Sequence, residues 1–332
     1  MAKADFDVLG IGNAIVDILV QAEDSFLEEN GLTKGAMGLV SADEQRALYD
    51  KTGQAIESSG GSAANTLAGI AALGGRAAFA GKVHDDQLGT VFAHDIRAAG
   101  VAFETDMATD GAPTATCLVL ISPDGQRTMQ TYLGACVDFA AADLDLAQVA
   151  AAEVIYLEGY LWDPDPAREA FFEAARVAHE AGRKVSLSLS DPFCVDRHRE
   201  GFLSFIQDHV DILFANEDEI LSLFQVDDFE TAIEKIRLMT GIAALTRSEK
   251  GSVIVTPDDM IRVPAAKIEP ENVIDTTGAG DAYAAGFLAA YTQGLDLSKA
   301  GELGGLLAAI IIQQIGARPS ADVQHLLQGI NS

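Results

Sequence analysis

The sequence predicts an α/β protein in which helices cover both faces of a central, largely parallel sheet and a second, smaller β-sheet is attached. Two observations lead to this prediction. Over most of the 332 residues, apolar strand patterns alternate with helical patterns, as they do in parallel sheets with helical crossovers. Between residues 101 and 133, however, strand patterns follow one another without helices.

The first hundred residues begin with strands and then change to regular alternation. Runs of apolar residues predict strands at 8–11, 15–20, 35–40 and 77–83. Apolar residues at helical spacing predict helices at 24–30, 42–51, 63–73 and 88–99. The early strands therefore precede the part of the chain in which the parallel sheet is expected.

The region without helices contains a turn signal, Pro123-Asp124-Gly125, between strand patterns at 116–122 and 128–133. Such a triplet favours a tight turn, so these two strands are expected to pair as an antiparallel hairpin. We expect the hairpin to belong to a discontinuous β lid over a cleft. The lid draws on residues about 14–21, 34–40, 55–59 and 102–133.

The second half of the chain returns to alternation. It predicts strands at 154–157, 185–188, 212–214 and 243–246, with a helix at 166–181 among the connections. A strand-like approach at 272–274 is followed by helices at 279–291 and 299–315 and by a short terminal helix. Because no repeat or low-complexity linker interrupts the pattern, a single domain over residues 1–332 is expected.

Charge and composition exclude several classes of protein. The chain has 22 basic and 50 acidic residues, a net charge of −28, and 48% hydrophobic residues. This composition is typical of a globular protein. The negative net charge disfavours a nucleic-acid-binding protein and a basic protein of the membrane surface. The first residues lack a secretion signal, and the longest apolar run, 306–312, is too short for a bilayer. The three cysteines have no metal-ligand spacing, so a cytoplasmic protein with free thiols is expected.

The strongest motif is Asp275-Thr276-Thr277-Gly278-Ala279-Gly280-Asp281, which precedes a long predicted helix. Its small residues let the backbone approach a ligand, and the free N–H groups of a helix start bind anions. Asp281 would lie in the first turn, where it could accept a proton from a hydroxyl that attacks phosphorus. The alternative is that Asp281 only complements the helix dipole. The missing capping-box spacing and the cost of helical glycines favour the functional interpretation.

Two polar segments nearer the amino terminus suit a sugar or another polyol. Gly61 and Asn65 lie in the segment 59–65 that leads into a helix, and Asn65 offers both a donor and an acceptor. The alternative there is a glycine turn with Ser62 as the N-cap. Asn13 and Asp17 are four residues apart and would share one face of a strand. The alternative interpretation of Asn13 and Asp17 is that they lie on a solvent-exposed edge of a strand.

A fourth segment, Asn216-Glu217-Asp218-Glu219, directly follows the predicted strand 212–214. Open α/β sheets bind ligands at the carboxyl ends of their strands. Asn216 and Glu219 could orient a hydrated magnesium ion, which keeps several of its waters. A helix N-cap with acidic residues in the first turn is the competing interpretation, and both can hold together.

Together these segments resemble the PfkB (ribokinase-like) family of sugar and nucleoside kinases. The resemblance extends from residues 8–13 to 316–320, and GGSAAN at 60–65 and DTTGAGD at 275–281 match its two signatures. It implies a ribokinase-like three-layer α/β/α domain with a largely parallel sheet and a small β-sheet lid. Within the family, the branch of adenosine kinases is the most similar, on the stretches 12–18, 113–117, 187–193 and 210–217.

The resemblance implies a role for each site residue. Asp281 would be the base that acts on a primary 5′ hydroxyl, and Gly278, Ala279 and Gly280 would hold the transferring phosphoryl group. Asn13, Asp17, Gly61 and Asn65 would bind the sugar, and Arg127 would contact phosphate. Asn216 and Thr246 would lie at the nucleotide, with Asn216 and Glu219 at magnesium. The purine would be enclosed by apolar or aromatic residues, which are Met37, Leu39, Cys117, Tyr132, Tyr160 and Phe193.

The expected function is ATP-dependent phosphorylation of a nucleoside, adenosine to AMP, with ATP and Mg²⁺. Potassium is often bound by the family, and its site would be formed by Asp275, Thr277, Gly316 and Ser320. Two alternatives stay open: a sugar kinase or a kinase of another nucleoside, and a catalytically silent nucleoside-binding protein on the same fold. A small-molecule substrate and a monomer or homodimer are expected, with neither nucleic acid nor membrane as a partner.

Overall fold

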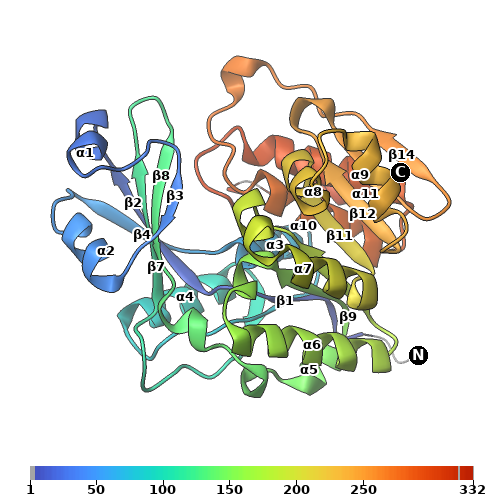
Figure 1. The fold of residues 1–332 in the computed structure, drawn as a ribbon, viewed down its shortest axis with the longest axis horizontal. Helices are drawn as coiled ribbons and strands as arrows, with labels where there is room; N and C mark the ends of the chain where they lie inside the picture. Colours follow the sequence, from blue (N-terminus) through green and yellow to red (C-terminus); the bar gives the residue numbers. More distant parts are fainter. Residues whose placement is uncertain (1–3, 321, 332) are drawn as a thin grey trace.

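The computed structural model describes residues 4–320 and 322–331 and contains two β-sheets that stand side by side (Figure 1). The large sheet has nine strands in the order β14-β13-β12-β11-β10-β9-β1-β5-β6. Neighbouring strands are parallel except in the pairs β12–β13 and β13–β14. Its strands are β1 (Phe6–Ile11), β5 (Ala77–Ala80), β6 (Val101–Phe103), β9 (Ala152–Glu158), β10 (Lys184–Ser188), β11 (Ile212–Asn216), β12 (Ile242–Thr246), β13 (Ser252–Val255) and β14 (Met260–Val263).

The small sheet has five strands in the order β3-β8-β7-β2-β4. These are β2 (Ile15–Gln21), β3 (Met37–Leu39), β4 (Ala55–Gly60), β7 (Ala115–Ile121) and β8 (Arg127–Tyr132). β7 and β8 form the expected antiparallel hairpin, because Gly125 takes the positive φ of 82° that the turn requires. The helices α1 (Asp24–Glu29) and α2 (Ala42–Tyr49) lie beside this sheet in Figure 1.

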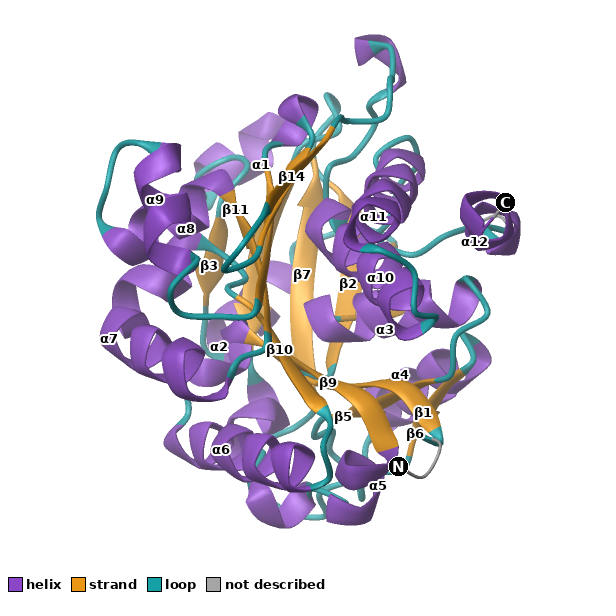
Figure 2. Ribbon diagram, turned by 90° about the vertical axis from the view of Figure 1, so that its right-hand side faces the viewer, coloured by secondary structure: helices purple, strands orange, loops and turns teal. Residues whose placement is uncertain are grey.

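Helices cover both faces of the large sheet, as Figure 2 shows. One face carries α3 (Ser62–Ala72), α4 (Gln87–Ala98), α10 (Ala279–Thr292) and α11 (Leu297–Ile311). The other carries α5 (Leu146–Ala151), α6 (Asp165–Glu180), α7 (Pro192–His209), α8 (Glu217–Phe224) and α9 (Phe229–Ile236). The chain ends with α12 (Gln324–Asn331). None of the helices in the described ranges combines the length and apolar character needed to cross a bilayer.

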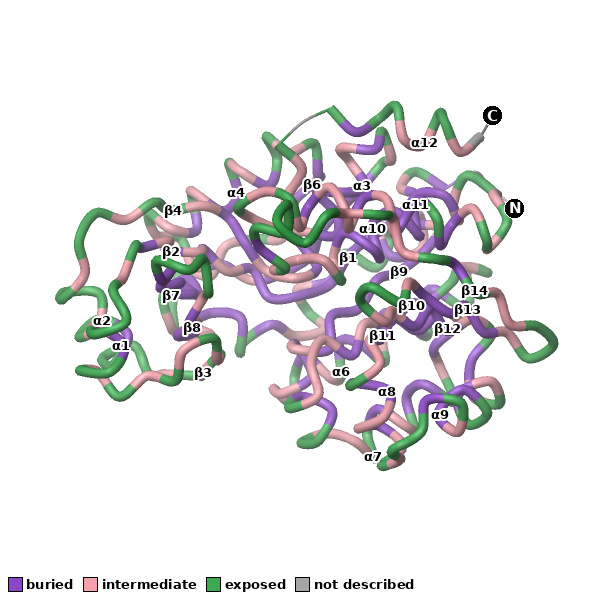
Figure 3. The backbone as a smooth tube through the Cα atoms, turned by 90° about the horizontal axis from the view of Figure 1, so that it is seen from above, coloured by how far each residue is buried: buried purple, intermediate pink, exposed green. Residues whose placement is uncertain are grey.

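Alternation along the central strands divides the core into two layers. In β9, Val154 and Tyr156 belong to the cluster under α3 and α10, whereas Ile155 and Leu157 belong to the cluster under α6 and α7. Successive strand side chains point to opposite faces, so a strand that is covered on both faces is apolar throughout. Figure 3 shows this buried backbone in the middle of the larger body, with exposed segments around it.

The helices α10 and α11 approach each other through glycine. A Cβ atom at Gly286 would lie 2.6 Å from the carbonyl oxygen of Leu303, and one at Gly304 would lie 2.7 Å from that of Tyr283. No side chain fits between the two backbones at these positions. α10, which begins at the DTTGAGD motif, is therefore held against α11 by direct backbone contact.

The structure differs from the sequence prediction at three places. The expected strand at 272–274 is wrong: Pro270–Asn272 form a 3-10 turn, and the N–H of Ile274 donates to the carbonyl of Ile312 (2.8 Å). The segment 102–133 was expected in the small sheet, but its first residues lie in β6 of the large one. The hairpin of β13 and β14 was not anticipated.

Candidate active site

The carboxyl ends of the parallel strands bring the predicted polar residues to one edge of the large sheet. Asn13 follows β1, Glu158 ends β9, and Asn216 and Thr246 end the neighbouring strands β11 and β12, where they are direct partners in the register. α3 and α10 begin at this same edge and pack against each other. Ligands of open α/β sheets bind at such an edge.

Asp281 is the third residue of α10, but its carboxylate does not cap its own helix. Oδ1 accepts a hydrogen bond from the hydroxyl of Ser62 (2.6 Å), and Oδ2 accepts one from the amide nitrogen of Asn65 (3.3 Å). Both donors come from the first turn of α3. The N-cap of α10 is Gly278, which offers no side-chain cap. No side chain therefore caps the N–H groups at the start of α10, and those without a backbone partner can bind an anion.

Gly278 is required by its backbone conformation and by its surroundings. Its φ is 75°, in the left-handed region, and a Cβ atom there would lie 2.4 Å from the Cβ of Ala317. Gly280, in contrast, faces open space, with no atom within 4 Å of an added Cβ among the described residues. The N–H of Ala279 donates to the carbonyl of Thr276 (3.2 Å). Of the three predicted phosphoryl-binding residues, Ala279 thus already has a backbone partner.

A buried carboxylate joins β1, β9 and α3. Glu158 is 1% exposed, and its oxygens accept the backbone N–H and the amide of Asn13 (3.2 and 2.7 Å) and the N–H of Ala63 (2.7 Å). Gly61 lies just before this contact with a φ of 92°, and a Cβ atom there would lie 2.4 Å from the carbonyl oxygen of Asn13. Glu158 therefore fixes Asn13 and the glycine turn at 60–61 relative to each other.

Asp17 reaches the same place from the small sheet. It lies on β2, and its Oδ2 would be 2.3 Å from a Cβ atom at Gly60. Arg318, in the loop after α11, bridges the two sides: its Nε donates to Oδ1 of Asn65 (3.0 Å) and its Nη1 to the hydroxyl of Ser59 (2.6 Å). The described arrangement thus brings Asp17, Asn65 and Asp281 together around one guanidinium.

Burial raises the pKa of four carboxyl groups at this edge. The pKa values of Asp17 and Asp281 are raised to about 6, and those of Glu158 and Glu219 to about 7. In each case the loss of hydration of the charged form is the largest cause. Attraction to Arg318 acts in the opposite direction on Asp17 and Asp281. Several acidic groups with raised pKa values in one place are typical of a functional site.

Asn216 and Glu219 form a closed pair at the start of α8. Oδ1 of Asn216 accepts the N–H of Glu219 (2.8 Å), while the Glu219 carboxylate accepts the N–H and the amide of Asn216 (2.9 and 2.6 Å). This is a capping box, so the competing interpretation as a helix cap is observed. No group of three His, Cys, Asp or Glu residues within the described ranges could hold a metal directly. The oxygens of Asn216 and Glu219 suit a cation that keeps its waters.

The predicted potassium residues do not form an open cation site. The carboxylate of Asp275 accepts the N–H groups of Thr277 (3.0 Å) and Gly316 (3.2 Å) and forms an ion pair with Arg127. The hydroxyl of Ser320 donates to Gln314 instead (2.6 Å). In this arrangement the Arg127 guanidinium pairs with Asp275, and potassium enters no step below.

Comparisons with known proteins identify the family of the chain. The model of the pfkB family carbohydrate kinases matches residues 37–324. The chain belongs to this family. An adenosine kinase from Sinorhizobium meliloti has a solved structure with a TM-score of 0.92 and 51% identity, covering 98% of this chain and 99% of that one. The predictions of a PfkB phosphotransferase with an alcohol acceptor and of a ribokinase-like fold are confirmed.

Similar PfkB proteins are described with two different activities, as a sugar kinase and as adenosine kinases. A probable sugar kinase from Rhizobium etli CFN 42 has a TM-score of 0.92 and 49% identity, with 99% of both chains covered. The adenosine kinase of Saccharomyces cerevisiae is 28% identical over 95% of this chain and 97% of its own length. The chain is therefore similar over its whole length to family members described as nucleoside kinases and as a sugar kinase.

The residues expected to enclose the base of a PfkB nucleoside substrate are only partly brought together. In the small sheet, Leu39 pairs with Thr131, Thr131 with Cys117, and Cys117 with Asp17, so these side chains share one face. Met37 and Arg127 have the same parity and lie on that face too. Tyr132 follows Thr131 directly and lies on the opposite face. The register therefore separates Tyr132 from the other predicted residues of the small sheet.

The remaining two predicted base-contacting residues lie in segments that follow strands β9 and β10 of the large sheet. Tyr160 lies just after β9, and its hydroxyl donates to the carbonyl of Ser190 (3.3 Å). Phe193, at the start of α7, is 62% exposed and stacks under the Arg197 guanidinium at 4.2 Å. Leu39 is also exposed, at 49%. Large exposed apolar side chains of this kind suit a surface that a ligand covers.

Three residues of the site were not predicted from the sequence. The sequence predicts Ser62 as an N-cap, but α3 begins at Ser62 itself and the Ser62 hydroxyl donates to Asp281. Glu158 and Arg318 received no role. The one available signal for Glu158 was its place at the end of an apolar strand, because a charged residue there must be paired when buried.

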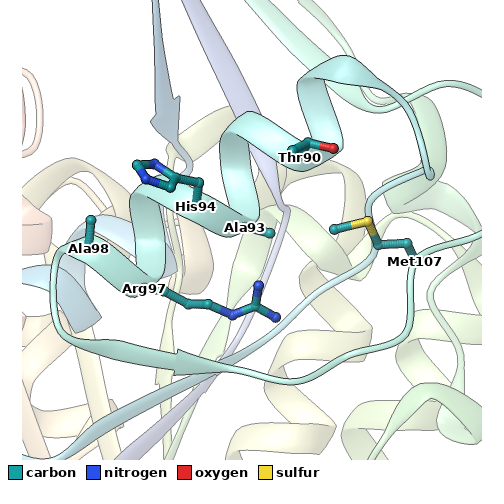
Figure 4. Close-up of a pocket in the computed structure, with 6 residues that line it drawn as sticks. All are labelled: Thr90, Ala93, His94, Arg97, Ala98 and Met107. Carbon is teal, nitrogen blue, oxygen red and sulfur yellow. The ribbon is translucent and has the colours of Figure 1, made fainter.

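A separate pocket lies away from this edge. It has a volume of about 450 Å³ and is formed by α4 and the segment around Met107 (Figure 4). Its lining consists of Thr90, Ala93, His94, Arg97, Ala98 and Met107. None of the predicted site residues lines this pocket, so it plays no part in the proposed site.

Proposed function

We propose that the chain transfers the γ-phosphoryl group of ATP to the primary 5′ hydroxyl of adenosine and forms AMP. The observation that carries the chemistry is the Asp281 carboxylate, which is turned away from its own helix start and held by Ser62 and Asn65. The choice of adenosine is supported by 51% identity to the Sinorhizobium meliloti adenosine kinase over nearly the whole of both chains.

Asp281 would act as the general base. A pKa of about 6 leaves its carboxylate ionised at neutral pH, yet basic enough to accept a proton. The proton of the 5′ hydroxyl moves to a carboxylate oxygen as the hydroxyl oxygen forms its bond to the γ-phosphorus. The bond from that phosphorus to the bridging oxygen of ADP breaks in line, and no covalent enzyme intermediate is needed.

The backbone at the start of α10 would stabilise the charge of the transferring group. Gly278 and Gly280 present N–H groups at the positive end of the helix dipole, and the open space at Gly280 admits a phosphoryl group. Magnesium, when bound with ATP, supplies further positive charge to the phosphate oxygens. Asn216 and Glu219 would hold its waters, and Thr246 lies beside Asn216 at the nucleotide end of the site.

The small sheet would supply the substrate-binding face and act as a lid. Asp17 and Asn65 offer acceptors and donors for the ribose hydroxyls, near Asn13 and Gly61. The apolar side chains of Met37, Leu39 and Cys117 continue that face and would contact the purine. Arg127, from the same face, would exchange its partner Asp275 for phosphate when ATP is bound.

The substrate assignment is tested by a coupled ADP assay with ATP and Mg²⁺. Adenosine, inosine, ribose and fructose are compared at equal concentrations. We expect kcat/KM for adenosine to exceed that for ribose by at least about a hundredfold, since the base contacts add binding energy. Equal turnover of adenosine and a free sugar would favour the second candidate, a sugar kinase, which the similarity to the Rhizobium etli protein supports.

A catalytically silent nucleoside-binding protein would give a different result. Such a protein would bind adenosine in calorimetry but release no ADP from ATP with any of the four acceptors. The three free, buried thiols are compatible with the cytoplasmic location that we propose. Light scattering of the purified chain would distinguish a monomer from a homodimer.

A further inference from the structure

Arg318 lies where three separate parts of the chain meet. It belongs to the loop after α11, and its guanidinium donates to Asn65 in α3 and to Ser59 at the end of β4. These partners are 253 and 259 residues away in the sequence. A planar fork with donors at fixed angles is suited to hold two acceptors in one geometry. Arg318 therefore ties the large sheet's helix layer to the small sheet.

The contact with Asn65 determines how that amide faces Asp281. Oδ1 of Asn65 accepts from the Arg318 Nε at 3.0 Å, so its Nδ2 points the other way and donates to Oδ2 of Asp281. The reverse orientation of the amide would place an N–H group against an N–H group and an oxygen against a carboxylate. Arg318 thus selects the orientation in which Asn65 serves the carboxylate.

The charge of Arg318 acts on the same group. Besides Asp281, it faces Asp17 from β2 and Asp95 from α4. Its remaining donor, Nη2, is buried and has no hydrogen-bond partner among residues 4–320 and 322–331. The charge of Asp281 in turn acts on titratable groups of β2, β9, the turn after β9 and α8, which are Asp17, Tyr156, Glu158, Tyr160 and Glu219. Arg318 is the cation that acts on Asp281 within this largely acidic surrounding.

We infer that Arg318 is a positioning residue for the phosphoryl transfer: it orients Asn65 so that the amide holds Asp281 in place. The inference rests on the proposed role of Asp281 as the base. It assigns Arg318 no contact with the reacting atoms. Because it acts through Asn65, its loss should affect the chemical step more than the binding of ATP.

The main experiment compares Arg318→Met and Arg318→Lys with the unchanged chain. For Arg318→Met we expect kcat at pH 7 to fall about 30- to 100-fold, with KM for ATP within about threefold, since a small displacement of a catalytic group is costly. The acid limb, meaning the fall of kcat on the acidic side of its pH profile, should shift by about one unit to higher pH. The reason is that removal of a nearby cation raises the pKa of the Asp281 carboxyl group. Arg318→Lys keeps the charge and should retain the original acid limb.

A matched control is Arg97→Met. Arg97 also donates through two guanidinium nitrogens, in this case to the carbonyl of Phe103 (3.0 and 2.6 Å), but it belongs to α4 and lines the separate pocket between α4 and Met107. Its variant should lose stability without any shift of the acid limb. If Arg318→Met behaves like Arg97→Met, with an unmoved acid limb and an unchanged kcat, the role is merely structural and the inference is overturned.

A double-mutant cycle with Asn65→Ala tests whether Arg318 acts through Asn65. Coupled residues give non-additive losses, so Asn65→Ala with Arg318→Met should reduce kcat no more than about threefold below Asn65→Ala alone. Fully additive losses would contradict the inference. Each variant is first checked by its thermal unfolding midpoint, and the kinetic comparison is confined to variants folded at the assay temperature.

Failure of the proposed function gives a separate signature. If the unchanged chain does not phosphorylate adenosine but turns over a sugar, the substrate assignment fails, and the same variants are measured with that sugar. The positioning role is then still judged by the acid limb and the cycle. If Asp281→Asn leaves turnover unchanged, the assigned base fails, and the inference about Arg318 loses its premise. If Asp281→Asn abolishes turnover while Arg318→Met leaves both kcat and its pH profile unchanged, the inference about Arg318 alone fails.

Discussion

The amino-terminal ends of α8 and α10 carry an acidic residue at the same position and use it differently. Glu219 is the third residue of α8 and Asp281 is the third residue of α10, and both helices begin at the same edge of the large sheet. Glu219 turns back and closes a capping box with Asn216. Asp281 has a glycine as its N-cap and turns to α3 instead.

The difference shows that the N-cap residue decides whether a first-turn carboxylate is available for chemistry. An N-cap with an amide side chain satisfies the helix start and engages the acid at the third position. A glycine N-cap leaves both the N–H groups and the carboxylate free for other partners. The two helix starts therefore have similar acids but opposite roles, and five experiments test this contrast.

The largest effect is expected for Asp281→Asn. Loss of the base should lower kcat by about a thousandfold or more, because general base catalysis contributes up to about four orders of magnitude. Adenosine binding, measured by calorimetry, should persist. Asp218→Asn at the start of α8 is the matched control, since it removes an exposed first-turn carboxylate. We expect its kcat to change less than about twofold, as exposed first-turn charges contribute little. Unchanged turnover of Asp281→Asn would refute the assigned base.

The second effect concerns the glycine N-cap itself. Gly278→Ala places a methyl group 2.4 Å from the Cβ of Ala317 in a left-handed conformation, so we expect about 1–3 kcal/mol less stability and about a hundredfold lower kcat. Gly280→Ala meets no atom within 4 Å and should be as stable as the unchanged chain, or more so by about 0.5–1 kcal/mol. Urea unfolding compares the two, and equal destabilisation would contradict the proposed requirement at Gly278.

The third effect is the pH dependence. If Asp281 must be ionised, kcat falls below a pKa of about 6 and is roughly tenfold lower for each pH unit under it. A rate profile controlled by Glu219 would bend near 7 instead.

Stability should change in the opposite direction over the same range. Carboxyl groups with raised pKa values bind more protons in the folded than in the unfolded state, so the free energy of unfolding decreases as pH rises from about 4 to 7. Asp281→Asn should flatten this decrease, as measured by urea unfolding at several pH values. An equally steep decrease in that variant would show that Asp281 does not contribute.

The smallest effect is expected for Asn216→Ala. Loss of the capping box should lower the free energy of unfolding by about 1 kcal/mol. Turnover at saturating Mg²⁺ should stay within about fivefold, while the Mg²⁺ concentration required should increase because water-held ligands bind it weakly. A loss of activity as large as that of Asp281→Asn would remove the contrast between the two helix starts.

Much of the fold could be predicted because its signals are local. Apolar runs and helical spacing identified the parallel strands, and Pro123-Asp124-Gly125 identified the hairpin. The predicted strand at 272–274 failed because Val273 and Ile274 have strand propensity, but the N–H of Ile274 pairs with the end of α11. Tertiary contacts override propensity in such short segments.

The site shows the same limit. Gly278 and the Asn216–Glu219 cap could be predicted since the conformational requirement of the one and the contacts of the other are local. Asp281 could be proposed from its motif, but its partners Ser62 and Asn65 lie 219 and 216 residues away and could not. Arg318 and Glu158 could not, because their contacts join segments 253 and 95–145 residues apart. Tyr132 was placed with the other base-contacting residues, but its strand face depends on a register that only the assembled sheet determines.

The glycine contact between α10 and α11 also bears on how this sequence can vary. Gly304 and Gly305 are adjacent in the chain, but a side chain at Gly304 would collide with the backbone of Tyr283, whereas one at Gly305 would enter open space. A library of substitutions should therefore accept most residues at Gly305 and reject nearly all at Gly304. Two neighbouring glycines would then differ sharply in the number of substitutions they accept, although neither lies in the candidate active site.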